Sequence, residues 1–122
     1  MAATKNAISI DVAKKMVQNQ STGNKEIMSL VREFKGDLDF AVLASTNPKI
    51  TFSAIKEIWE YYRPEVNGNA HTQKAGARWV RETIARCHPY HSLRLIKRDP
   101  EPSVRRILAE NLRKADENTD KL

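Results

Sequence analysis

Four places in this sequence pair an Asn or Asp with a Ser or Thr three or four residues later. The pairs are Asn19/Thr22, Asn47/Thr51, Asn69/Thr72 and Asp99/Ser103. Asn and Asp accept turn geometry, while Ser and Thr hydroxyls cap the amide groups that open a helix, so each pair predicts the end of one helix and the start of the next. Their spacings are 28, 22 and 30 residues. A recurring unit of this size, with a short helix on each side of a turn, is typical of stacked helical repeats.

Apolar residues between these turns recur at helical spacing. Ile27, Leu30, Val31 and Phe34 occupy positions i, i+3, i+4 and i+7, and Gly36 follows where a left-handed C-terminal cap is expected. The same pattern predicts further helices over residues 9–17, 51–62, 72–87, 93–96 and 103–112, the third of these carrying Gly76 in its interior. Residues 38–43 alternate and would allow a strand, but no partner strand exists in the sequence, so a short helix is favoured.

These observations predict an all-α fold. We expect a short α-solenoid of about four helix-turn-helix units, with residues 1–115 forming a single helical-repeat domain and residues 116–122 a frayed polar C-terminal tail. A length of 122 residues suits one domain better than two.

The composition is typical of an ordinary soluble globular protein. The longest uncharged apolar runs, such as residues 40–44, are far below the roughly 20 residues that cross a bilayer, and residues 1–10 lack the apolar core of a secretory signal. Cys87 is the single cysteine, so no internal disulfide can form. We therefore expect a cytoplasmic protein without a membrane segment.

Two segments resemble the variant leucine-rich repeat and the related HEAT-like helical repeats. They are residues 43–51 (LASTNPKIT) and, as the better match, residues 95–111 (LIKRDPEPSVRRILAEN). In such repeats an apolar helix ends in an Asn-Pro or Asp-Pro turn, and the second helix opens with a Val-Arg pair. The resemblance is strongest over residues 93–112 and weaker over 40–59.

The resemblance carries expectations of its own. It implies that Asp99 and Arg105 brace neighbouring units, and that the stacked helices form a groove for another protein. The iron-sulfur cluster of variant leucine-rich repeat proteins is not expected, because Cys87 offers only one thiol. No cofactor is predicted.

The cluster of Cys87, His88 and His91 is the one candidate for a metal or nucleophile site. A zinc site needs three or four ligands, and His71 is the remaining histidine. The simpler interpretation is that Cys87 fills an apolar stripe while the histidines lie at a helix end, where they meet free carbonyl groups. We therefore expect neither a metal nor a catalytic residue, and we do not expect an enzyme.

Basic residues concentrate in the second half of the chain. Residues 74–114 contain eleven Lys or Arg against four acids, a local net charge of +7 in a chain of net +6. The candidate basic face consists of Lys74, Arg78, Arg81, Arg94, Lys97, Arg98, Arg105, Arg106 and Arg113. Such a face would attract acidic proteins or phosphates, although a merely solvated surface is an equal alternative.

Trp79 points away from both the apolar stripe and the basic stripe of its helix. It is predicted to make a contact between units or, as the less favoured alternative, to belong to a binding face.

The function predicted is therefore a non-enzymatic binding module or adaptor that docks a macromolecular partner, with another protein favoured. The alternative is DNA or RNA held on the basic face of residues 74–114. The sequence leaves the oligomeric state open.

Overall fold

The computed structural model describes residues 8–63, 76–96 and 99–120 of the chain. Over these ranges the chain forms seven helices and no strand, which confirms the all-α prediction. The helices are α2 (Ile10–Gln18), α3 (Asn24–Phe34), α4 (Leu38–Thr46), α5 (Phe52–Tyr62), α7 (Ala77–Cys87), α8 (Pro89–Ile96) and α9 (Pro102–Asp120). The short helix preferred over a strand for residues 38–43 is α4.

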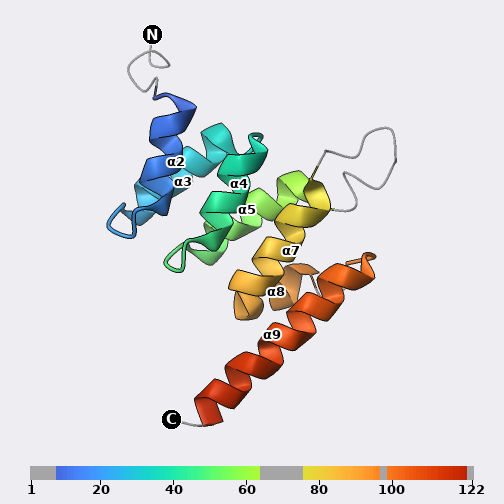
Figure 1. Ribbon diagram of the computed structural model, residues 1–122. Helices are drawn as coiled ribbons and strands as arrows, with labels where there is room; N and C mark the ends of the chain where they lie inside the picture. Colours follow the sequence, from blue (N-terminus) through green and yellow to red (C-terminus); the bar gives the residue numbers. More distant parts are fainter. Residues whose placement is uncertain (1–7, 64–75, 97–98, 121–122) are drawn as a thin grey trace.

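The helices lie in two layers (Figure 1). In one layer α2, α4, α7 and α9 contact one another in chain order, and in the other α3, α5 and α8 do the same. Each consecutive pair, α2 with α3, α4 with α5 and α7 with α8, also packs together across the layers. Figure 1 shows the first and last of these helices at opposite ends of the molecule. A solenoid of sequence repeats remains a prediction.

The core lies between the layers. Fully buried side chains come from every described helix, Val31 of α3 among them, and Ile27 and Leu30 of α3 are at most 5% exposed. Phe40 of α4, Ile55 of α5 and Ile84 of α7 lie along its middle. Val80 and Ile84 are buried, as predicted for the apolar stripe of α7. Cys87 is exposed, so the interpretation that it fills this stripe is wrong.

The helix ends and starts predicted from the turn pairs are confirmed in part. Asn47 caps the end of α4, and the Thr51 hydroxyl accepts a hydrogen bond from the Ala54 amide at the start of α5, 3.2 Å away, as predicted. Asn19 likewise follows the end of α2. Thr22, however, donates to the Met16 carbonyl at 2.7 Å, so it completes the end of α2 instead of starting α3.

The last two pairs do not follow the prediction. Ser103 lies inside the first turn of α9, because the helix begins at Pro102, and its hydroxyl donates to Glu82 of α7 instead of capping α9. Asn69 and Thr72 lie outside the described residues. The sequence alone does not reveal that the Ser103 hydroxyl has a partner on another helix. That hydrogen bond competes with local capping.

Both predictions about glycine are wrong. The cap of α3 is Lys35 in right-handed geometry, and Gly36 does not have a positive φ. Gly76 is not in a helix interior: it precedes α7 with φ of 77°, in the left-handed region that glycine adopts without strain. A Cβ at Gly76 would lie 2.6 Å from a methyl group of Leu38, so the missing side chain also lets α7 approach α4.

The predicted C-terminal tail is also helical. α9 continues to Asp120, past the expected boundary at residue 116, and Figure 1 shows its C-terminal end extending away from the other helices. In the part of the chain that the structure describes, no helix is both long and apolar enough to span a bilayer.

Gly76→Ser should destabilise the protein by about 2 to 5 kcal/mol, because a left-handed backbone and a collision with Leu38 act together. Gly23→Ser is the matched control. Gly23 also precedes a helix, but with φ of −68° and the nearest atom to its added Cβ 3.6 Å away, so it should change stability by about 0.5 kcal/mol or less. The measurement is urea unfolding of both variants, and equal stabilities would contradict this account of the α4–α7 contact.

Candidate functional site

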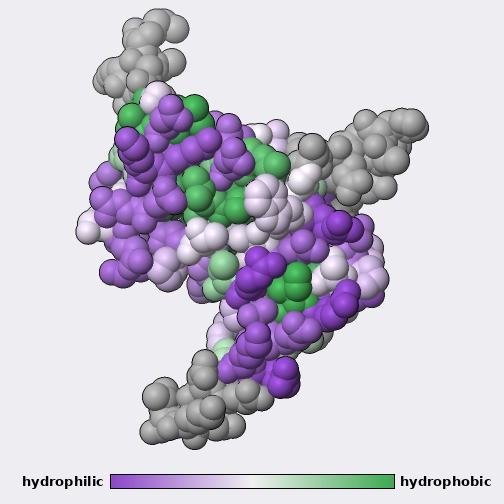
Figure 2. Space-filling model, viewed as in Figure 1, coloured by the Kyte–Doolittle hydropathy of each residue, from purple (hydrophilic) through white to green (hydrophobic). Residues whose placement is uncertain are grey.

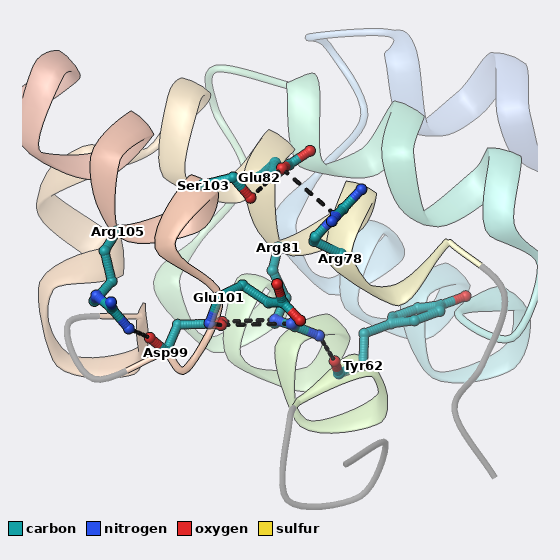
Figure 3. Close-up of polar contacts among 8 residues, drawn as sticks. All are labelled: Tyr62, Arg78, Arg81, Glu82, Asp99, Glu101, Ser103 and Arg105. Atoms are coloured by element: carbon teal, nitrogen blue, oxygen red, sulfur yellow. Dashed lines mark hydrogen bonds and ion pairs between the residues drawn. The ribbon is translucent and has the colours of Figure 1, made fainter. Parts of the chain in front are cut away.

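A buried ion pair links the segment before α9 to α7. Arg81 donates from Nε to an Asp99 carboxylate oxygen 2.6 Å away, and both side chains are 1% exposed (Figure 3). A second guanidinium nitrogen donates to the Tyr62 carbonyl at the end of α5, at 2.9 Å. One side chain therefore joins three segments that are far apart in sequence.

Asp99 also uses its other polar atoms. A carboxylate oxygen accepts the Glu101 amide at 3.0 Å, and the backbone carbonyl accepts a hydrogen bond from the Arg105 guanidinium. Arg105 thus contacts Asp99 only at its backbone carbonyl, because the Asp99 carboxylate pairs with Arg81. Arg81 is thus part of the core, and its assignment to the exposed basic face is wrong.

The other predicted basic residues vary in position. Lys74, Lys97 and Arg98 lie outside the described residues. Those that lie on exposed surface are Arg78, Arg94, Arg105, Arg106 and Arg113. Arg78 lies 3.8 Å from Glu82, the same carboxylate that accepts the Ser103 hydroxyl at 2.7 Å.

These exposed arginines do not form one continuous strip. Ser103 and Arg106 are three residues apart and share a face of α9, and Ser103 contacts α7, so Arg106 lies on the α7 side. Arg105 lines a groove with Leu93 of α8 instead. Figure 3 shows Arg78 and Arg105 on either side of the buried Arg81.

The exposed side of α7 carries an aromatic residue between arginines. Trp79 is 46% exposed, and Arg78 and Arg86 lie on exposed surface of the same helix. Trp79 and Arg86 are seven residues apart and therefore share a face. We call these three residues the Trp79 surface. Because almost half of Trp79 is open, the preferred prediction of a contact between units explains at most part of this side chain.

Apolar surface on α4 continues beside this helix. Gly76 lies against Leu38, so the α4 face that bears Leu38 and Val42, one turn apart, is the one directed toward α7. Val42 is partly exposed, and Figure 2 shows apolar surface over α4 on this side of the molecule, next to largely hydrophilic surface over α7 and α9. The apolar surface of α4 thus borders α7, the helix that carries Trp79.

The cluster of Cys87, His88 and His91 does not support a nucleophilic or metal-binding role. Desolvation raises the pKa of the Cys87 thiol, which disfavours the nucleophilic thiolate. His88 is buried between α7 and α8, with its ring 5.8 Å from that of His91. Burial lowers the pKa of His88, and backbone groups of Ser45 and Asn47 partly oppose this shift. Among the described residues, no three His, Cys, Asp or Glu side chains gather as metal ligands would.

A small open pocket of about 220 Å³ lies beside this cluster. Phe52, Tyr90, His91 and Arg94 line it. The Tyr90 hydroxyl donates to Asp116 of α9 at 2.8 Å, and the Phe52 and His91 rings pack 5.9 Å apart. These contacts connect the neighbouring helices α5, α8 and α9.

Comparison with protein-family models, with curated proteins and with solved structures found no significant match to this chain. The similarity to helical repeats therefore rests on the residues quoted for it.

Sequence reasoning missed two features of this region. The candidate basic face omits Arg86, although its seven-residue spacing from Trp79 can be read from the sequence. Leu93, in the segment predicted as a short helix over 93–96, is 38% exposed. Only the packing of α8 against α9 shows which side of that short helix remains open.

Asp99→Asn should lower the free energy of unfolding by about 3 to 5 kcal/mol, because the buried Arg81 guanidinium would lose its counter-charge. Glu57→Gln is the matched control. Its carboxylate pairs with Lys35 at 3.0 Å, but both side chains are 27% exposed, so the loss should be about 1 kcal/mol or less. Denaturant unfolding compares the two variants, and losses of similar size would show that the Arg81–Asp99 pair is not specially important.

Stability should fall as the pH is lowered from about 7 to about 5, partly through His88. Its pKa is lowered in the folded protein, so below the unfolded value of about 6.5 the unfolded chain binds more protons and is favoured. His88→Gln should remove part of this slope, whereas His91→Gln, at an exposed position, should retain most of it. Unfolding free energies of both variants measured across this pH range test the assignment. A larger reduction of the pH dependence by His91→Gln than by His88→Gln would refute it.

Proposed function

We propose that this chain is a non-enzymatic helical-repeat module that docks another protein. Three helix pairs packed in two layers, together with a final helix, support the idea of a short α-solenoid related to HEAT-like and variant leucine-rich repeats. In this view the single thiol suits a cytoplasmic protein.

The observation that carries this proposal is the exposure of Trp79. Tryptophan and arginine are the residues most enriched among those that dominate protein–protein binding energy. Trp79 is 46% exposed, and Arg78 and Arg86 flank it on α7. A partner that covered Trp79 would gain apolar burial at the ring and electrostatic attraction from the two guanidinium groups.

Nucleic-acid binding is the alternative function, and the net charge of +6 favours it. Two observations weaken it. Arg81 is buried against Asp99, and Arg105 and Arg106 lie on different sides of α9. A duplex bound through several phosphates would need these charges on one accessible path.

Site-specific photocrosslinking in cells that make the protein tests the proposal. A photoreactive phenylalanine analogue replaces Trp79, and in the matched control it replaces Lys56, an exposed residue on α5. We expect discrete protein adducts from position 79 and not from position 56. An excess of wild-type chain should compete them away, and a Trp79→Ala competitor should be about 30-fold weaker.

Three results would contradict protein docking on the Trp79 surface. The first is the absence of adducts from position 79, and the second is equal competition by wild-type and Trp79→Ala chains. The third is an adduct sensitive to nuclease. In that case purified protein should bind an oligonucleotide with a log affinity that falls by about 0.9 per neutralised phosphate for each unit of log salt.

A further inference from the structure

An apolar groove lies between α8 and α9, and its lining includes no residue of the Trp79 surface. Leu93 of α8 and Leu108, Ala109 and Leu112 of α9 line it, with Arg105 at one edge, and its volume is about 260 Å³. Leu93 is 38% exposed, and Ala109 is also exposed. The floor is therefore hydrocarbon that the chain itself leaves open to water.

The size of the groove favours a side chain over a free small molecule. Pockets that enclose drug-sized ligands typically start at about 300 Å³ and bury most of the ligand surface. This groove is smaller and open along two helices. Helices commonly dock on such surfaces by placing apolar residues at i, i+3 or i+4 and i+7 into the trough.

The charge at the groove favours an acidic occupant. Arg105 is the one charged residue among those that line it. Its guanidinium donates to the Asp99 carbonyl, a neutral acceptor, and makes no ion pair with a described residue. Arg94 follows Leu93 in sequence but lines the separate pocket next to α5. No carboxylate among the lining residues therefore offsets the Arg105 charge.

We propose that the α8–α9 groove binds an acidic amphipathic helix of a partner protein. Its apolar side chains would cover Leu93, Leu108 and Leu112, and a carboxylate would meet Arg105. A second copy of this chain suits the groove less well, because two chains of net charge +6 repel each other. Since the groove shares no residue with the Trp79 surface, the two proposals can fail separately.

Fluorescence anisotropy with the full chain and a synthetic helical peptide tests this assignment. The probe peptide carries Leu at i, i+4 and i+7 with Glu on both flanks. We expect it to bind in the micromolar range, about 1 to 100 μM, and to weaken as salt is raised. A peptide with the same leucines and Lys in place of Glu should bind at least about tenfold more weakly.

Variants of exposed residues locate the binding without threatening the fold. Ala109→Glu and Leu93→Asp place a charge in the groove and should weaken the acidic peptide at least about tenfold, and Arg105→Gln, which keeps a hydrogen-bond donor, should weaken it through loss of charge. Val12→Asp is the control, since Val12 is a similarly exposed apolar residue, 45% open, on α2. Circular dichroism and thermal unfolding confirm that each variant folds.

Several outcomes would overturn the assignment. They are no binding of the acidic peptide, equal binding of the acidic and basic peptides, and equal weakening by Val12→Asp and Ala109→Glu. A dimer seen by light scattering that Ala109→Glu dissociates would assign the groove to a second copy. Oligonucleotide binding lost in the same variant would assign it to nucleic acid.

Discussion

The buried pair of Arg81 and Asp99 is the interaction on which the second half of this structure depends. It fixes the segment that follows α8, and hence the starting point of α9, against α7 and the last turn of α5. Burying two charges is costly, and such a pair often adds little net stability compared with an apolar contact of the same shape. Its consequence here is positional: an alternative placement of α9 would leave a guanidinium and a carboxylate without partners in the core.

Other polar contacts reinforce this position of α9. Ser103 reaches Glu82 on α7, and Tyr90 of α8 reaches Asp116 near the other end of α9. With both sides of the helix oriented, Leu108 is buried while Ala109 and part of Leu112 remain at the edge of the α8–α9 groove. The proposed docking groove is thus a consequence of how α9 is held.

The helices themselves were predictable because they depend on local patterns. The stripe Ile27, Leu30 and Val31 and the cap at Thr51 follow from spacing and side-chain chemistry within a few residues. The errors at Arg81, Gly76 and Ser103 involve partners that are distant in sequence. Arg81 shares helical spacing with Arg78 and so resembles a surface residue, but its counter-charge lies 18 residues further along the chain. Gly76 needs its conformation because α4 packs against it, and Ser103 bonds to α7 instead of its own helix. Predicting the candidate sites required knowing which helix faces remain uncovered, and only the packing of the layers determines that.

Hydrogen exchange of Asp99→Asn compared with the wild-type chain tests most directly whether the buried pair positions α9. If it does, amides of α8 and α9 should lose protection in the variant while those of α2 and α3, at the other end of the molecule, keep theirs. Unchanged protection in α9, or an equal loss in all helices, would contradict the claim that this pair holds the helix that forms the groove.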